Sequence, residues 1–277
     1  MLVKPKKVKT WRKPMIKACF AEMFGTMVIV FFGSFLYKQL DDINTANEIP
    51  GSKKTIPNWS QAAIGQGLMQ MICIWSFYKM SGAHFNPAVT IACMCLRKMP
   101  TKAGVLFMVS QVFGSFVASL LFTSLKPSSS SLGIPKIQGT FTESSIFFVE
   151  FLATAFYIWA VYAFTYDHRN DKNLIGLVLG MMAIGQILCV GPISGAAINP
   201  ARTLGPILVT LMGGNNWMLI STELYKYWYY LLGPVLGALC VSFYYEFFLN
   251  FEEELNPDLS FDSYEGDKEQ EKEKLKY

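Results

Sequence analysis

The sequence predicts an all-α membrane protein in which six transmembrane helices and two re-entrant half-helices form an inverted repeat. Composition is the first reason: 52% of the 277 residues are hydrophobic, the mean hydropathy is +0.31 and only 16% are charged. Soluble domains carry about 25% charged residues. The second reason is that the apolar residues lie in long runs almost without charge. The third is a ten-residue pattern that occurs twice, once in each half of the chain.

Each copy of this pattern combines a turn with a helix start. Residues 81–90 read Ser-Gly-Ala-His-Phe-Asn-Pro-Ala-Val-Thr, and residues 194–203 read Ser-Gly-Ala-Ala-Ile-Asn-Pro-Ala-Arg-Thr. Asparagine is a preferred N-cap, and proline fits the first helical position, where its missing N–H costs nothing. An apolar stretch of about ten residues follows each copy, equivalent to about 15 Å of helix. Because the hydrocarbon core is about 30 Å thick, we predict two half-helices that meet at the midplane.

The doubled motif resembles that of a known family, the aquaporins or major intrinsic proteins, and the resemblance extends over about residues 15–250. It rests on two triplets, each preceded by Ser-Gly-Ala: Asn86-Pro87-Ala88 and Asn199-Pro200-Ala201. The resemblance implies that both triplets line a pore at the bilayer midplane. It also implies single-file passage of water, exclusion of protons and ions, and a homotetramer with one pore per subunit.

The first half of the chain begins with a basic flank. Residues 1–17 hold seven Lys or Arg and no acidic residue, which is typical of a cytoplasmic segment. Apolar runs of about 20 residues are long enough to cross a bilayer. Three such runs predict spans at residues 16–37, 60–79 and 103–125, with the first half-helix at 89–96. We expect a polar loop over residues 38–59, where charged residues interrupt the apolar pattern.

The second half repeats this order. Three further apolar runs predict spans at residues 145–166, 174–191 and 227–249, and the second half-helix runs from 203 to about 212. The tail over residues 251–277 is charged and poor in apolar residues, which is typical of disorder. We therefore expect one channel domain over residues 18–250, made of the repeat halves 18–125 and 145–250.

The distribution of basic residues predicts the orientation. The amino-terminal flank and the connections at 97–102 and 167–173 hold twelve Lys or Arg, and the three opposite loops hold six. Basic residues gather on the cytoplasmic side, so we expect both termini in the cytoplasm, with the plasma membrane as the expected location. Three spans per half then require the second half to be inverted relative to the first.

Several other classes of protein are disfavoured. Six cysteines lie in apolar segments and are expected to be free thiols rather than a disulfide framework. Only two histidines occur, so we expect no metal site. We find no nucleophile–base constellation and no cofactor-binding loop, which disfavours an enzyme and predicts no cofactor. The basic residues sit at the ends of spans and do not indicate nucleic-acid binding, and the basic start has no apolar region typical of a cleavable signal peptide.

Four residues at membrane depth are assigned roles. Glu22 and Glu150 are ionisable residues inside spans, which are by default functional or paired. The resemblance implies that both glutamates bond the backbone of the re-entrant loops, and we interpret His84 as a residue that braces the first loop. Arg202 follows the second motif directly, and the resemblance implies that it is the selectivity-filter arginine, which donates to solutes and repels cations.

The resemblance also places the other filter positions by their distance from the motifs. The implied set is Gln66, Ile187, Ala196 and Arg202, with Gln61 and Gln70 left open as alternatives for the first position. Water-selective relatives usually carry Phe and His at the first two positions, and glycerol facilitators a Trp/Gly/Phe/Arg pattern, so this set matches neither. Residues 191–196 look like those of the nodulin-26-like branch, whose members pass glycerol or other small neutral solutes. The solute therefore stays open among water alone, or water with glycerol or urea.

Two functions from different classes remain in view. The first is a passive channel for water and small neutral solutes, which the intact asparagine pair and Arg202 favour. The second is a non-conducting membrane protein that uses the same fold for adhesion or signalling. An ion-coupled transporter is disfavoured, since away from the ends of the spans only Glu22, Glu150 and Arg202 are charged within the spans and re-entrant segments. Use of the glycosylation sequon at Asn58 is left open.

Overall fold

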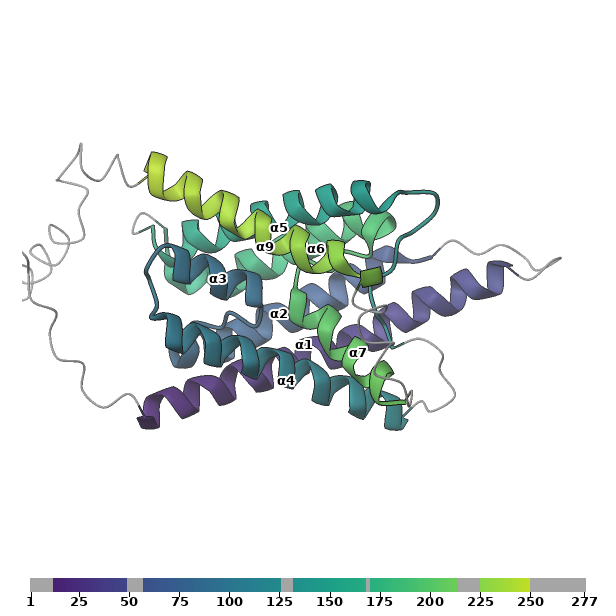
Figure 1. Cartoon of the computed structure of the whole chain (residues 1–277), viewed down its shortest axis with the longest axis horizontal. Coiled ribbons are helices and arrows are strands. Elements are labelled where there is room, and N and C mark those ends of the chain that lie inside the picture. Colours follow the sequence, from purple (N-terminus) through teal and green to yellow (C-terminus); the bar gives the residue numbers. More distant parts are fainter. Residues whose placement is uncertain (1–11, 49–56, 126–131, 168–169, 214–224, 250–277) are drawn as a thin grey trace, which may run out of the picture.

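The computed structural model describes residues 12–48, 57–125, 132–167, 170–213 and 225–249, and all its regular elements within these ranges are helical (Figure 1). The elements are α1 (Arg12–Glu48), α2 (Trp59–Ser81), α3 (Pro87–Cys95), α4 (Thr101–Leu125), α5 (Glu143–Thr165), a short 3₁₀ turn (Lys172–Leu174), α6 (Ile175–Ser194), α7 (Pro200–Gly213), α9 (Trp228–Tyr244) and a π-helical turn (Tyr245–Leu249). The start of the basic flank, the lysines at 53 and 54, His168, most of the loop after α7 and the charged tail lie outside the described residues.

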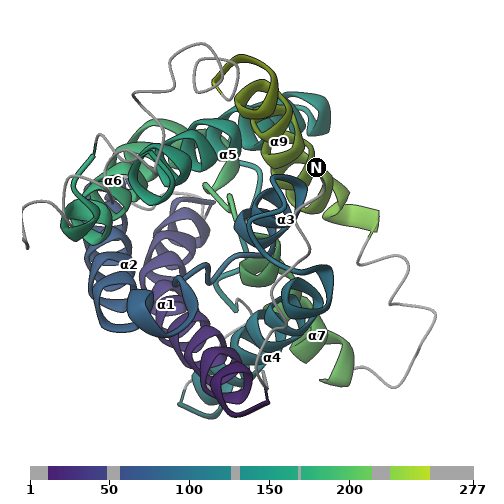
Figure 2. The same ribbon diagram turned by 90° about the vertical axis from the view of Figure 1, so that its left-hand side faces the viewer.

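The helices form a ring when the molecule is viewed end-on (Figure 2). Around this ring, α1 packs on α2, α2 on α6, α6 on α5 and α5 on α9. On its other side, α1 packs on α4. The two halves use the same contacts: α1 packs on α2 and α4 as α5 packs on α6 and α9. Likewise α7 packs on α4 and α3 on α9, so each short helix rests on a long helix of the other half.

The two short helices lie toward opposite ends of the bundle, α3 at the left and α7 at the right of Figure 1. They have 9 and 14 residues, against 20 to 25 in α2, α4, α5 and α6. Both begin with a proline that follows an asparagine, as the motif predicts. Their arrangement matches the expected pair of half-helices that enter from opposite ends.

The first helix corrects one expectation. Residues 38–48 were expected to belong to a polar loop, but α1 continues through them to Glu48. Lateral hydrogen bonds hold this polar extension: Gln61 Nε2 donates to Gln39 Oε1 over 3.2 Å, and Asn44 Nδ2 donates to Gln138 Oε1 over 3.2 Å. An ion pair between Lys38 and Asp42, one helical turn apart, also favours the helix. The polar residues from 38 onward therefore mark the end of the apolar run, whereas the helix itself ends only at Glu48.

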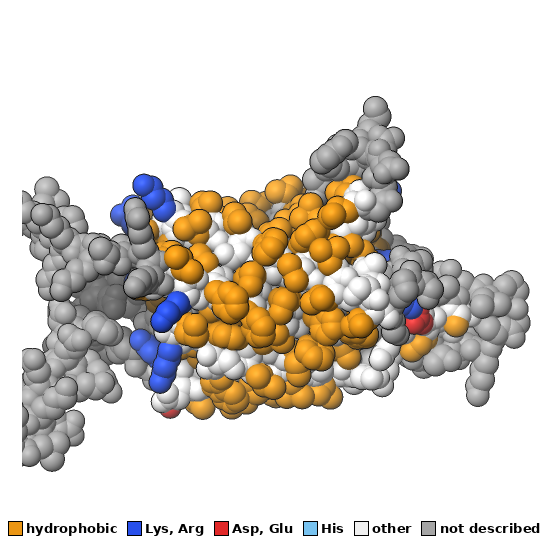
Figure 3. All heavy atoms as spheres, turned by 90° about the horizontal axis from the view of Figure 1, so that it is seen from below, with side chains coloured by type: hydrophobic (Ala, Val, Ile, Leu, Met, Phe, Trp, Pro, Cys, Tyr) orange, Lys and Arg blue, Asp and Glu red, His pale blue; other side chains and the backbone are white. Residues whose placement is uncertain are grey.

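The outer surface of the bundle is apolar between its two ends, and Lys and Arg gather at one end (Figure 3). Within the described residues, five helical segments are long and apolar enough to cross a membrane: Pro14–Asn44, Thr101–Leu125, Glu143–Thr165, Lys172–Ser194 and Trp228–Phe247. The sixth expected span, α2, has 23 residues but carries three glutamines, at 61, 66 and 70. It lies in the same ring between α1 and α6, and part of its lower hydropathy comes from Gln66, which the bundle buries.

Candidate functional site

A buried glutamate holds the loop that leads into α3. The side chain of Glu22, on α1, is fully buried. Its carboxylate accepts hydrogen bonds from the backbone N–H of His84 at 3.0 Å and of Phe85 at 2.7 Å, from Ser81 Oγ at 2.5 Å and from Gln111 Nε2 at 2.8 Å. Four donors on one carboxylate compensate for the loss of water around the charge.

Glu150 does the same for the loop that leads into α7. It is fully buried on α5 and accepts from Ser194 Oγ at 2.6 Å, from Ala197 N–H at 2.9 Å and from Ile198 N–H at 2.6 Å. Both glutamates therefore contact the re-entrant loops in the way that the resemblance implies. The first network is larger, because Gln111 also donates to Thr90 Oγ1 at 3.0 Å, and His84 Nδ1 lies 3.1 Å from the same hydroxyl.

The two loops share an uncommon backbone conformation. Positive φ angles occur at Ala83 (52°) and Phe85 (49°), and at the equivalent Ala196 (47°) and Ile198 (54°). Such angles are unfavourable for residues other than glycine and persist only where the surroundings fix them. Here the glutamate bonds to the N–H groups of Phe85 and Ile198 supply that constraint. Each loop thus depends on a buried carboxylate that comes earlier in the chain, about 60 residues before the first loop and about 45 residues before the second.

The two motif asparagines meet and bond across the halves. Asn86 Oδ1 accepts from Ala88 N–H at 2.9 Å, and Asn199 Oδ1 accepts from Ala201 N–H at 3.0 Å, so both act as helix caps. Asn86 Nδ2 donates to the carbonyl of Ile198 at 3.0 Å, and Asn199 Nδ2 donates to that of Phe85 at 2.8 Å. Since an asparagine amide has two N–H groups, each keeps one that these bonds do not use.

A narrow cavity of about 50 Å³ runs beside this pair. It has room for a few water molecules. The structure brings all four implied filter residues into its lining together with both asparagines and His84, although they come from several elements of the chain. Ile187 is 3% exposed and supplies an apolar wall, while Gln66 and Arg202 supply polar groups.

Arg202 is the cationic group of this cavity and is buried at 6% exposure. Its Nη1 donates to the carbonyl of Ala196 at 3.0 Å, and its Nη2 has no hydrogen-bond partner among the described residues. The guanidinium carbon lies 3.9 Å from the centre of the Tyr37 ring, within cation–π range. Sequence reasoning missed Tyr37. It lies near the end of the first span, 165 residues before Arg202, and no motif in the sequence connects the two residues.

The structure separates the three glutamines that were candidates for the first filter position. Gln61 is exposed and bonds Gln39, away from the cavity. Gln66 is buried in the lining, donates to the carbonyl of Ile29 at 3.3 Å and leaves its Oε1 without a partner among the described residues. Gln70 also lines the cavity and donates through Nε2 to Tyr157 Oη at 2.5 Å. The chosen residue therefore lies at the cavity, and Gln70 lies there too.

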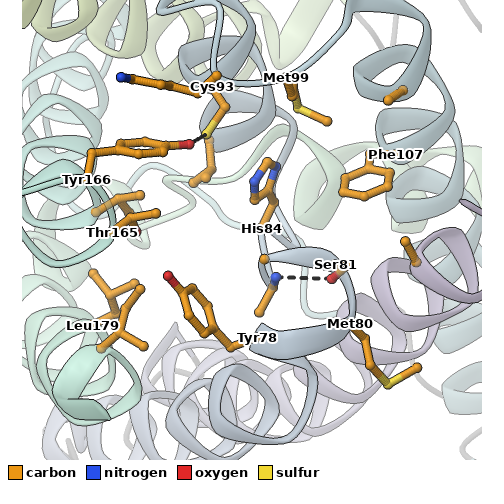
Figure 4. A pocket seen from close by; sticks show the side chains of 18 of the residues that line it. Tyr78, Met80, Ser81, His84, Cys93, Met99, Phe107, Thr165, Tyr166 and Leu179 are labelled. Carbon is orange, nitrogen blue, oxygen red and sulfur yellow. Dashed lines mark hydrogen bonds between the residues drawn. The ribbon is translucent and has the colours of Figure 1, made fainter. Parts of the chain in front are cut away.

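A wider cavity of about 500 Å³ opens on the α3 side (Figure 4). Its labelled side chains include Tyr78, His84, Cys93 and Tyr166, and Tyr166 Oη donates to Cys93 Sγ at 3.1 Å. His84 and Tyr157 line both cavities, so they stand where the wide cavity meets the narrow one. The His84 side chain therefore lines both cavities and also contacts Thr90 beside the first re-entrant loop, where it was expected to brace the loop.

No group of three or more His, Cys, Asp and Glu side chains that could hold a metal ion occurs in the described part of the chain. All six cysteines are free thiols. Asn58 caps α2, because its Oδ1 accepts from Gln61 N–H at 3.2 Å, which places the sequon at a helix start.

Comparison with known proteins gives consistent matches along the chain. The family model described as "Major intrinsic protein" matches residues 7–245. The probable aquaporin AqpM of Archaeoglobus fulgidus is 30% identical over 239 residues, which cover 82% of this chain and 94% of that protein. The putative aquaporin NIP4-1 of Arabidopsis thaliana is 33% identical over 229 residues, covering 81% and 72%. The solved aquaglyceroporin from Plasmodium falciparum aligns with a TM-score of 0.72 at 21% identity, covering 87% and 99%, which shows the shared fold.

Proposed function

Because this chain belongs to the major intrinsic protein family and is thus a multi-pass membrane channel for water and small solutes, we propose that it conducts water in single file and excludes protons and ions. The observation that carries this proposal is the narrow cavity that Arg202 and both asparagines line. A volume of about 50 Å³ allows no broad water column. A solute that passes must exchange its hydrogen bonds one at a time with the lining groups.

The charges around the cavity support exclusion of cations. The amino ends of α3 and α7 meet at the asparagine pair, and a helix N-terminus carries about half a positive charge. The guanidinium of Arg202 adds a full positive charge in the same lining. Positive helix ends and an arginine in a pore are electrostatic barriers to protons and other cations. The free N–H of each asparagine orients water with its oxygen inward.

The lining supports a mixed solute preference. Ile187 gives the filter an apolar wall, which suits the carbon backbone of a polyol, and Arg202 Nη2 and Gln66 Oε1 offer a donor and an acceptor without partners among the described residues. A His in place of Ile187 would be polar on that side as well. We infer rapid water flux with slower, measurable flux of glycerol or urea.

Placement in the cell follows the same reasoning. Exposed basic residues lie at the end of the bundle where α1 starts and α3 joins α4, among them Lys17, Arg97, Lys98 and Lys102. The positive-inside rule then assigns this end to the cytoplasm. The apolar outer surface leaves the subunit free to pack as a homotetramer in the plasma membrane, with one pore in each subunit.

The test is stopped-flow light scattering of proteoliposomes that contain the purified protein. Shrinkage in sucrose measures water flux, and re-swelling in glycerol and in urea measures solute flux. The wild type should exceed empty liposomes in sucrose by about tenfold, since a pore replaces the barrier of the bilayer with a barrier at least about 1.4 kcal/mol lower. Water flux no faster than that of empty liposomes would contradict the proposal and favour the non-conducting adhesion or signalling role.

Ile187→His tests the solute preference within the same assay. The imidazole adds a polar group opposite Arg202 and removes the apolar wall. We expect glycerol and urea flux to fall by about tenfold or more, the scale of one lost apolar contact or one misplaced polar group, while water flux falls by less than about twofold. Ile187→Val keeps an apolar wall and serves as the control. Parallel loss of all three fluxes, or absence of solute flux in the wild type, would return the channel to the water-selective class.

A further inference from the structure

A hydrogen bond crosses the pore wall on the α3 side of the asparagine pair. Gln70, on α2, donates through Nε2 to the hydroxyl of Tyr157, on α5, over 2.5 Å. These two helices flank α6, and each packs on it. Both side chains line the narrow cavity, together with Ala183 of α6. The bond therefore forms a bridge between two helices that both pack on α6, at a place where α6 contributes only the small side chain of Ala183 to the same lining.

The bridge stands at the throat of the pore. Tyr157 lines the wide cavity of about 500 Å³ as well as the narrow one of about 50 Å³, and it shares this position only with His84 among the residues that line these two cavities. Tyr157 is 4% exposed, so its ring is fixed in the wall. A solute that leaves the narrow cavity for the wide one must pass the bridged pair.

We propose that the Gln70–Tyr157 bridge is a second solute-discriminating constriction, separate from the filter at Arg202, which restricts passage of polyols relative to water. This inference rests on the proposed function of the chain as a channel. It assigns a specificity role to two residues that the doubled motif does not mark.

The internal repeat argues that the fold itself does not need this bond. Ile29 lies seven residues after Glu22, as Tyr157 lies seven after Glu150. Ala183 lies 12 residues before Gly195, as Gln70 lies 12 before Gly82. The positions equivalent to the bridge thus carry Ile29 and Ala183, which have no hydrogen-bonding side chain, and both line the same narrow cavity. The equivalent helices, α6 and α1, are placed without such a bond, so the bond between α2 and α5 is a feature of the pore wall that the repeated fold does not require.

The chemistry of the bridge suits discrimination by size and by hydrogen bonding. The tyrosine hydroxyl accepts from Gln70 and keeps its own O–H to donate, and the amide oxygen of Gln70 is a further acceptor that this bond does not use. A water molecule needs one donor and one acceptor and can exchange both here. A polyol has a wider cross-section and several hydroxyls, so it must displace the bridge or leave some of its hydroxyls without hydrogen bonds. A hydroxyl that has lost its water and found no partner carries a free-energy penalty.

Two variants break the bridge in different ways. Tyr157→Phe removes the hydroxyl and keeps the ring, and Gln70→Ala removes the amide and opens space. The matched control is Tyr162→Phe, on the same helix: Tyr162 is fully buried and its hydroxyl bonds Ser242 Oγ at 2.6 Å, but it lines neither cavity. Each protein is reconstituted, and permeability to water, glycerol and erythritol is measured with the stopped-flow assay.

We expect both bridge variants to raise the ratio of glycerol to water permeability by about fivefold, the equivalent of one ordinary hydrogen bond. The increase should be larger for erythritol, and the double variant should not exceed Gln70→Ala. Tyr162→Phe should leave the ratios unchanged, even where it lowers the melting temperature. If Gln70→Ala does not fold, Tyr157→Phe decides the matter.

Unchanged ratios in a folded Tyr157→Phe, or the same change in Tyr162→Phe, would overturn the inference and leave the bond a packing feature. This failure is distinct from failure of the channel function. In the first case the wild type conducts water and only the solute ratios stay fixed, whereas in the second the wild type does not conduct at all.

Discussion

At the scale of single residues, the proposed filter depends on how one guanidinium is held. Arg202 is held by the carbonyl of Ala196 and the ring of Tyr37, and its Nη2 has no hydrogen-bond partner among the described residues, so this donor is available to a solute in the narrow cavity. The carbonyl of Ala196 is available because that residue has a positive φ angle, and Glu150 fixes the loop that contains it. The chemistry of one cation therefore depends on a carboxylate in another helix.

Arg202→Val should keep the fold and let protons pass. Removal of the positive charge lowers the electrostatic barrier in the narrow cavity, so we expect proton flux to rise by at least about tenfold, which corresponds to a barrier about 1.4 kcal/mol lower. A pH-sensitive dye inside proteoliposomes measures the flux under an imposed pH gradient. Arg202→Lys is the control, because it keeps the charge while it loses the planar fork. A tight Arg202→Val channel with normal water flux would place the proton barrier elsewhere.

Residue identities were predictable from the sequence where a local motif marked them. The asparagine pair, Arg202 and the two glutamates could be located because each belongs to a pattern that occurs twice or to a charge inside an apolar run. Tyr37 and Tyr157 could not be located in this way. Each acts through a contact with a residue far along the chain, Arg202 and Gln70, and a tyrosine in a span has many other uses.

At the scale of elements, close approach of helices holds each half together. An added Cβ at Gly114, on α4, would clash with the carbonyl oxygen of Met23 on α1, and one at Gly237, on α9, would clash with that of Phe151 on α5. Met23 follows Glu22 as Phe151 follows Glu150, so the two contacts are equivalent in the repeat. Small residues at such crossings let helix backbones approach closely in membranes.

Gly114→Ala and Gly237→Ala should each destabilise the protein by about 1–3 kcal/mol, because backbone atoms must separate to admit the methyl group. Thermal unfolding in detergent, followed by intrinsic fluorescence, measures the effect. Gly185→Ala is the control: it lies within α6 with no atom close to an added Cβ, and alanine favours a helix by up to about 1 kcal/mol. A melting temperature that falls equally in all three variants would mean that the two crossings carry no special constraint.

Element boundaries were predictable where apolar length decided them. The second, third and fourth spans were placed within two residues of α2, α4 and α5 at each end. The end of α1 was wrong by eleven residues, since hydrogen bonds to Gln61 and Gln138 stabilise a polar helix and these partners come from later parts of the chain. Hydropathy reports the environment of a segment and carries no information on such lateral bonds.

At the scale of the whole molecule, an apolar belt with basic residues at one end determines how the channel sits in a bilayer. We predict that epitope tags at both termini will be detected by antibodies only after the plasma membrane is permeabilised, since the positive-inside rule assigns the basic end to the cytoplasm. A tag inserted in the loop between α1 and α2 should be detected on intact cells. Detection of a terminal tag on intact cells would reverse the orientation.

The inverted arrangement was predictable from an odd number of spans in each half, and the doubled helix contacts agree with it. The filter's preference among solutes was less predictable, because it depends on which side chains share a cavity of about 50 Å³ and on which of their polar atoms stay without partners. Gln66 and Gln70 differ by one helical turn in the sequence. Only the packing of α2 on α1 and α6 shows that both reach the pore wall and that Gln61 does not.

The crossed bonds between the asparagines and the opposite loops have a consequence for biosynthesis. Asn86 donates to the carbonyl of Ile198, and Asn199 donates to that of Phe85, so each half supplies a hydrogen-bond partner for polar groups of the other half. A ribosome releases the first of these groups more than a hundred residues before the second. We infer that the Asn86 amide and the Phe85 carbonyl stay without these hydrogen-bond partners until the later half has entered the bilayer. The two crossed bonds can form only when both halves are in place, so a chain truncated between the two motifs cannot form either of them.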